Sequence, residues 1–205
     1  MNYPQISKGL KLVFFGEMVE LLGVAATSLL VAIGSAGAMI GSAAAFLAAN
    51  IAAGILMIRG LYIAGKTQSL FATAWQIVAG LVLAEVLAGV LSLFPTASSF
   101  FHGGLSEIVI TIMDVMSTMC VLQGITACYD AIGVKKGGSF IKLTTTLFII
   151  KLIAGIIVNF WSSLIEASAV LLTVFTIAFA IVELLSYIFW LCCLFKASGK
   201  IGKAG

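Results

Sequence analysis

The sequence predicts an all-α, polytopic integral membrane protein with six transmembrane helices arranged as three antiparallel hairpins. Of its 205 residues, 62% are hydrophobic and 9% are charged, whereas about 25% are charged in ordinary soluble domains. The mean hydropathy is +1.22. Because so few polar residues cannot coat a water-soluble domain, we expect the lipid bilayer to surround most side chains. We expect residues 1–205 to form a single membrane domain.

Six apolar segments are each long enough to cross a bilayer, which requires about 20 residues. Short breaks that contain glycine, lysine or proline separate the first five of them. The expected helices span residues 12–33, 40–64, 70–94, 105–132, 140–161 and 167–195. Lys8 and Lys11 precede the first segment as basic residues do in a signal peptide, but Glu17 and Glu20 interrupt its apolar run. We therefore expect this first helix to be retained.

The positions of lysine and arginine predict the orientation, since cytoplasmic loops carry an excess of both. Basic residues lie before the first helix, after the second, around the fourth-to-fifth connection and in the C-terminal tail: Lys8, Lys11, Arg59, Lys66, Lys135, Lys136, Lys142, Lys196, Lys200 and Lys203. The three opposite connections contain none. Both termini are therefore expected in the cytoplasm and the chain in the plasma membrane. Since no basic face is formed, nucleic-acid binding is not expected.

Small residues recur every four positions in two of the expected helices, a pattern typical of close helix packing in lipid. The second helix carries Gly37, Gly41, Ala45, Ala49 and Ala53. The third helix carries Gly80, Ala84, Ala88 and Ser92. The pattern fits contacts within the chain, a homo-oligomer or a membrane partner subunit.

Several ionisable residues fall inside the apolar segments, where an embedded charge is costly and is a functional hypothesis by default. The candidate proton or ion site consists of Glu85, Asp114, Lys151 and Glu183. Secondary candidates are Glu17, Glu20, Asn50 and Asn159. Helical spacing places most of the charges on polar stripes that should face the bundle interior. The stripe on the fifth helix comprises Thr144, Lys151, Gly155, Asn159 and Ser162.

Depth in the membrane predicts two pairings among the candidate residues. Glu85 and Asp114 lie about equally far from the turn between the third and fourth helices, so two carboxylates there would share a proton or hold a cation. Lys151 lies about 16 Å into the fifth helix by the helical rise, and its expected partner is Glu183. Both a neutralising structural pair and a gating or substrate-anchoring pair fit these positions.

No motif indicates an enzyme. His102 is the only histidine, which excludes a His-rich metal site and a Ser–His pair. The sequence contains no HExxH, GxSxG, phosphate-binding glycine loop or CxxC, so neither a metal nor a cofactor is expected. Two hypotheses remain: a small cation- or proton-coupled transporter, channel or membrane subunit of a transport system, and a non-transport accessory, assembly or self-protection protein. The sequence does not indicate a substrate.

Overall fold

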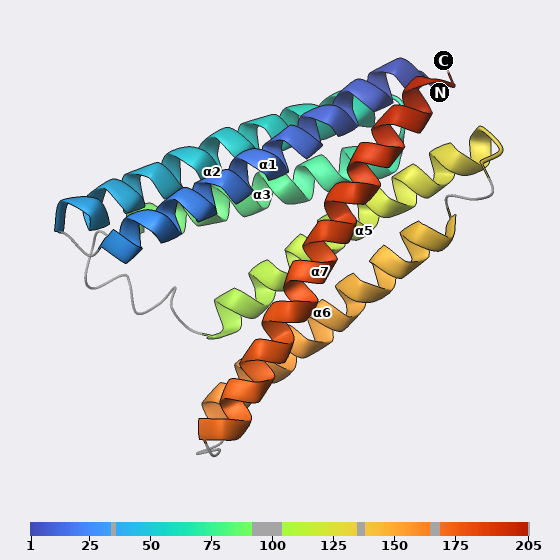
Figure 1. Ribbon diagram of the computed structural model, residues 1–205. Coiled ribbons are helices and arrows are strands. Elements are labelled where there is room, and N and C mark those ends of the chain that lie inside the picture. The colour runs from blue at the N-terminus through green and yellow to red at the C-terminus, as the bar shows by residue number, and fades with distance from the viewer. Residues whose placement is uncertain (34–35, 92–103, 135–137, 165–168, 205) are drawn as a thin grey trace. The chain divides into compact units, whose positions relative to one another are not determined.

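The computed structural model describes residues 1–33, 36–91, 104–134, 138–164 and 169–204, and these are helical apart from short turns and ends (Figure 1). The helices are α1 (Tyr3–Ile33), α2 (Ala36–Gly65), α3 (Ser69–Leu91), α5 (Gly104–Ala131), α6 (Gly138–Leu164) and α7 (Ala169–Gly202). No residue within these ranges forms a strand. The all-α class is confirmed, and each helix overlaps one predicted apolar segment.

Five helices are long and apolar enough to cross a membrane, by length and composition, among the residues that the structure describes. α3 adds a shorter apolar stretch, Ser69–Ala84. Large aliphatic side chains on the helix surfaces are widely exposed: Leu29 is 70% exposed and Ile33 68%. Since soluble proteins avoid extended exposed apolar surfaces, these are the properties of a helical membrane protein.

The chain divides into two compact units. Unit 1 comprises Met1–Val82 and Leu194–Gly205, and unit 2 comprises Leu83–Cys193. α3 and α7 are each continuous helices with residues in both units. The single membrane domain expected for residues 1–205 stays a prediction.

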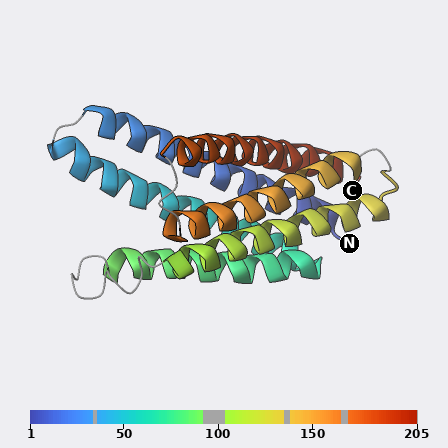
Figure 2. The same ribbon diagram turned by 90° about the horizontal axis from the view of Figure 1, so that it is seen from below.

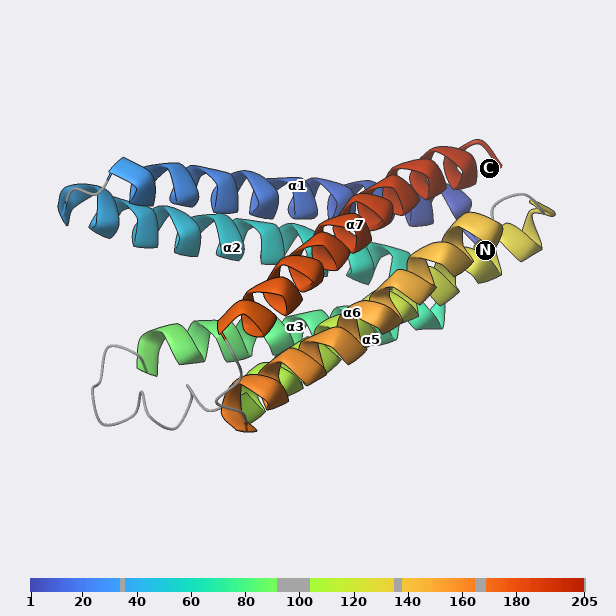
Figure 3. The same cartoon turned by 60° about the horizontal axis from the view of Figure 1, so that its bottom comes forward.

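In unit 1, α1 and α2 run antiparallel and their backbones nearly touch (Figures 1 and 3). A Cβ atom at Gly9 would overlap the carbonyl oxygen of Gly60, and a Cβ at Gly60 would lie 2.5 Å from the carbonyl oxygen of Gly9. A Cβ at Gly16 would lie 2.9 Å from the carbonyl oxygen of Ala53. Only residues without a side chain allow so close an approach, as is typical of helix pairs in lipid.

The same α1–α2 seam continues towards the other end of the pair. A Cβ at Gly23 would overlap the Cβ of Ala49. Ala49 and Ala53 belong to the small-residue ridge predicted on the second helix, so this part of the ridge does pack against a neighbouring helix. By contrast, a Cβ at Gly41 would have nothing within 4 Å. The α1 partners of the ridge were not predicted, although Gly9, Gly16 and Gly23 recur every seven residues.

α1 begins well before the predicted residue 12. Asn2 precedes the helix, and its Oδ1 accepts a hydrogen bond from the backbone N–H of Gln5 at 3.3 Å, which satisfies one of the unpaired donors at the helix start. Pro4 lies in the first turn, where a missing N–H is harmless. α1 therefore starts at Tyr3, because capping extends the helix beyond its apolar run.

α7 likewise continues beyond the predicted residue 195, and its last turns pack against the start of α1 within unit 1. The Ser7 hydroxyl donates to the carbonyl oxygen of Ser198 at 2.7 Å, and the Phe14 and Phe195 rings lie 5.7 Å apart. Five apolar side chains on these two helix ends are fully buried: Ile6, Leu10, Leu194, Ala197 and Ile201. Residues expected to form a charged tail therefore form a packed helix end.

In unit 2, α5 and α6 lie side by side (Figures 2 and 3). α5 ends at Ala131, and Gly133 lies two residues beyond it with a left-handed φ of 73°. The N–H of Val134 donates to the Tyr129 carbonyl oxygen at 2.9 Å, and the N–H of Gly133 donates to that of Asp130 at 3.2 Å. This is the Schellman arrangement, in which a C-terminal glycine satisfies the last carbonyl groups of a helix.

Candidate functional site

The polar stripe predicted on the fifth apolar segment lies on α6 and faces both α5 and α7. Thr144 is fully buried, and its hydroxyl lies 3.3 Å from the Cys193 thiol of α7. Gly155, further along α6, is also buried, and a Cβ there would contact side chains of both α5 and α7 at 3.6–3.9 Å. Because Lys151 follows Thr144 by seven positions and precedes Gly155 by four, helical periodicity directs it to the same neighbours.

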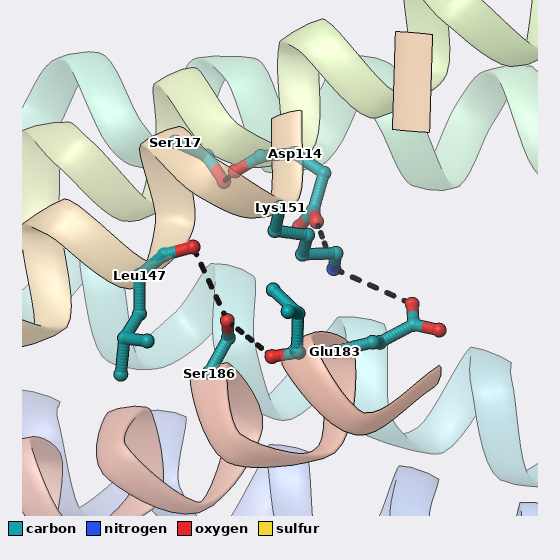
Figure 4. A network of polar contacts seen from close by, with 7 residues as sticks. Asp114, Ser117, Leu147, Lys151, Glu183 and Ser186 are labelled. Carbon is teal, nitrogen blue, oxygen red and sulfur yellow. Dashed lines mark hydrogen bonds and ion pairs between the residues drawn. The ribbon is translucent and has the colours of Figure 1, made fainter. Parts of the chain in front are cut away.

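Lys151 lies between two carboxylates from different helices (Figure 4). Its Nζ is 3.4 Å from Oδ2 of Asp114 on α5 and 3.7 Å from Oε1 of Glu183 on α7. The lysine side chain is 18% exposed, whereas those of Asp114 and Glu183 are 45% and 52% exposed. In this Asp114–Lys151–Glu183 cluster the base is therefore central, and the acids lie at the rim.

An aromatic pair positions the lysine. The ammonium group of Lys151 lies 5.7 Å from the centroid of the Phe148 ring, on the same helix, so that the electron-rich ring attracts the cation. Phe148 is buried and meets Trp190 of α7 edge-on, with ring centroids 6.2 Å apart. Contacts between α6 and α7 therefore hold the ring that steadies the ammonium group.

Hydroxyl groups next to the cluster bind backbone carbonyls. Ser117 donates to the Asp114 carbonyl oxygen at 2.8 Å. Ser186 lies 2.7 Å from the carbonyl oxygen of Val182 on its own helix and 3.3 Å from that of Leu147 on α6 (Figure 4). The Ser117 bond lies within α5, whereas Ser186 also approaches the neighbouring helix α6. Lys151 is the donor that contacts both carboxylates.

The charges of the cluster do not balance, because one base serves two acids. If all three groups are ionised the cluster has a net charge of −1, which is costly within an apolar helix bundle. One proton or one small monovalent cation would neutralise it. Both Lys151 distances, 3.4 and 3.7 Å, exceed the 2.7–2.9 Å typical of tight charge-assisted hydrogen bonds.

The structure brings together three of the four main candidate residues. The contact expected between Lys151 and Glu183 is present. Asp114, which was assigned to a pair with Glu85, contacts the same lysine. Glu85 lies on α3, but its side chain falls outside the described residues, and the Glu85–Asp114 pair stays a prediction.

Three of the four secondary candidates lie in unit 1, whereas the cluster lies in unit 2. Glu17 and Glu20 are half-buried on α1, and Asn50 is half-buried on α2, all in unit 1. Asn159 lies on α6, and its side chain is outside the described residues.

Sequence reasoning missed two features of the cluster, the aromatic contact from Phe148 and the shared role of Lys151. Phe148 precedes Lys151 by three positions on a helix, a spacing at which side chains meet. The contact of Lys151 with two acids could have been inferred from the sequence. Lys151 is the only embedded base, and the apolar segments before and after its helix each carry an embedded acid. Within the residues that the structure describes, no three His, Cys, Asp or Glu side chains converge as metal ligands.

No protein-family model, curated protein or solved structure matches this chain.

Proposed function

We propose that the chain crosses the plasma membrane six times, as three hairpins with both termini in the cytoplasm. Five long apolar helices support this topology, and α3 supplies the sixth. The basic residues cluster at alternate helix ends, as cytoplasmic positions do. A fluorescent reporter that folds only in the cytoplasm should fluoresce at the C-terminus and stay dark when inserted between α3 and α5. Fluorescence at the inserted position would contradict the proposed topology.

We infer that the Asp114–Lys151–Glu183 cluster is the coupling site of a small transporter or channel for protons or cations. The observation that supports this function is the unequal charge, one lysine between two half-exposed carboxylates. An acid that the lysine does not neutralise takes up a proton or a cation, and releasing it on the other side of the membrane would complete a transport cycle. The protein acts alone, as a homo-oligomer or as the membrane subunit of a larger transport system.

Flux measurements on the full chain in proteoliposomes test this function. Glu183→Gln and Asp114→Asn each remove the surplus negative charge and leave a lysine–carboxylate pair. We expect either change to lower proton or cation flux at least tenfold, while Lys142→Gln, on the exposed surface of α6, leaves the flux unchanged. Flux that is absent from the natural chain under proton, sodium and potassium gradients would exclude this function.

A second proposal is a non-transport accessory, assembly or self-protection protein whose embedded charges only hold its helices together. The observation that favours it is that Lys151 joins α6 to both α5 and α7. A structural role needs one acid to neutralise the lysine, and it therefore tolerates the loss of either acid alone. Removal of the base leaves two carboxylates uncompensated, and an unpaired embedded charge is strongly destabilising.

The two proposals therefore predict different results for one variant, Glu183→Gln. Glu183→Gln should fold normally in both cases, but it should abolish flux only if the cluster transports. Normal folding of this variant, together with full biological activity in the producing cell and no flux by the natural chain, would favour the accessory role.

A further inference from the structure

A groove separate from the embedded cluster lies in unit 1, where the start of α1 meets the end of α7. Its volume is about 480 Å³, within the roughly 300–1,000 Å³ of small-molecule sites. Its lining residues are Pro4, Ser7, Lys8 and Lys11 on α1 and Ser198, Gly199, Gly202 and Lys203 at the end of α7. Three of the eight residues are lysines, and none is acidic.

Small residues keep the groove open. Ser7 and Ser198 line it and are buried, and the Ser7 hydroxyl donates to the Ser198 carbonyl oxygen. A Cβ at Gly202 would lie 2.7 Å from the Ser7 hydroxyl oxygen, so the two helices touch at this point. A Cβ at Gly199 would meet nothing within 4 Å. The space beside Gly199 is therefore unfilled by the chain itself.

The three lysines have no counter-charge within the part of the chain that the structure describes. Lys8 and Lys11 are exposed, as is Lys203, and no described carboxylate lies within ion-pairing distance of them. The first turn of α1 contains no acidic residue. An anion in the groove would supply the missing counter-charge.

The lysines of the groove lie beyond the ends of the apolar runs, where the headgroups of a lipid bilayer are expected. Lys8 and Lys11 lie just outside the apolar run that starts at residue 12, and Lys203 lies beyond the run that ends at residue 195. Aromatic contact between Phe14 and Phe195 closes the adjacent apolar side of the same helix pair. Basic pockets at this level between membrane helices are suited to phosphate-bearing lipid headgroups.

We propose that this groove binds the phosphate of an anionic phospholipid, with the ammonium groups of Lys8, Lys11 and Lys203 as its partners. The lysines act as mobile point charges on the phosphate oxygens, and the opening beside Gly199 admits the headgroup. The site is independent of the proposed transport function. The proposed topology decides only the leaflet, which would be the cytoplasmic one.

Binding can be measured with the full chain in a neutral detergent, by fluorescence polarisation of a labelled phosphatidylglycerol. Lys8→Gln, Lys11→Gln and Lys203→Gln are combined in one variant, all at exposed positions where the fold is unaffected. Each lysine near an anionic headgroup contributes about fivefold, so the triple variant should bind roughly a hundredfold more weakly. A matched control with the same loss of charge, Arg59→Gln, Lys66→Gln and Lys142→Gln, should keep its affinity within about threefold.

A second variant, Gly199→Leu, keeps every charge but fills the open space, and it should also weaken binding at least tenfold. Equal weakening in the groove triple and the control triple would overturn the proposal in favour of diffuse charge attraction. Unchanged binding in Gly199→Leu would exclude the groove itself. Unlabelled phosphatidylglycerol should compete, whereas phosphatidylcholine should not. Competition by inorganic phosphate or glycerol phosphate as strong as that by the lipid would overturn a lipid ligand in favour of a soluble phosphate.

Discussion

The hydroxyl of Ser7 donates a hydrogen bond of 2.7 Å to the carbonyl oxygen of Ser198, although 191 positions separate the two residues in the chain. Both residues are buried. The contact fastens the end of the last helix to the start of the first, with fully buried apolar side chains around it. The two terminal segments therefore belong to the packed protein.

We predict that Ser7→Ala lowers the free energy of unfolding by about 1–2 kcal/mol, because a buried carbonyl oxygen loses its side-chain donor. Thermal unfolding in a mild detergent, followed by far-UV circular dichroism, measures the effect. Ser28→Ala is the control: Ser28 is exposed, and its hydroxyl donates to the Val24 carbonyl oxygen of its own helix. Equal stability of the two variants would mean that the Ser7 contact does not hold the helix ends.

The α1–α2 seam predicts a steep penalty for a single methyl group. Gly9→Ala should lower the free energy of unfolding by about 1–3 kcal/mol, since the new Cβ overlaps the Gly60 backbone and the helices must move apart. Gly41→Ala adds the same methyl group on α2 where nothing lies within 4 Å, so it should leave the stability unchanged or slightly raised. A comparison of unfolding temperatures is sufficient, and similar losses in both variants would contradict the close seam.

The cluster on α5, α6 and α7 predicts an asymmetry between its base and its acids. Lys151→Met should destabilise the protein by about 1–3 kcal/mol, because two carboxylates lose the cation that they share. Asp114→Asn and Glu183→Gln should each cost less than about 1 kcal/mol, because a neutral lysine–carboxylate pair remains. Lys142→Met, at an exposed position of α6, is the control and should change the stability by no more than about 0.5 kcal/mol. Denaturant or thermal unfolding in detergent ranks the four variants. The reverse order, with the acids more sensitive than the base, would show that Lys151 is not the shared partner.

The end of α5 predicts an effect of backbone conformation alone. Gly133 has a φ of 73° and open space around its Cβ position, so Gly133→Ala meets no steric clash with neighbours. It should still cost about 1–2 kcal/mol, because L-residues disfavour the left-handed region, and Gly133→Asn should cost less. Gly138→Ala, with equal space and no positive φ, is the matched control and should be neutral. Their unfolding temperatures in detergent test the difference, and a similar change at both positions would argue against the Schellman end.

The sequence predicted the helices well and their ends poorly. Apolar runs of membrane-spanning length determine where each helix lies, because every backbone polar group in lipid must be paired within the helix. The extra turns at the start of α1 and the end of α7 contain lysines and serines, and they depend on the Asn2 cap and on the contact between Ser7 and Ser198. Such a contact between distant parts of the chain leaves no periodic signal.

The candidate site was predicted in its residues but not in its connections. An embedded charge is conspicuous in an apolar sequence, so Asp114, Lys151 and Glu183 could be found without a structure. The prediction used depth along the helix axis to give each acid one partner. It paired Glu183 with Lys151 and Asp114 with Glu85. Which acids share a lysine depends on how helices are arranged around α6, and hydropathy carries no information about that arrangement.

The spacing of the α1–α2 seam restricts how these two helices can move. Gly9, Gly16 and Gly23 recur every seven residues, which corresponds to about 10 Å along the helix axis. An axial slide shorter than this brings larger side chains against a carbonyl backbone, as Leu12 and Val13 already border Gly60. The pair therefore has one register, and sliding requires the two helices to separate first. A movement that preserves these backbone contacts carries α1 and α2 together.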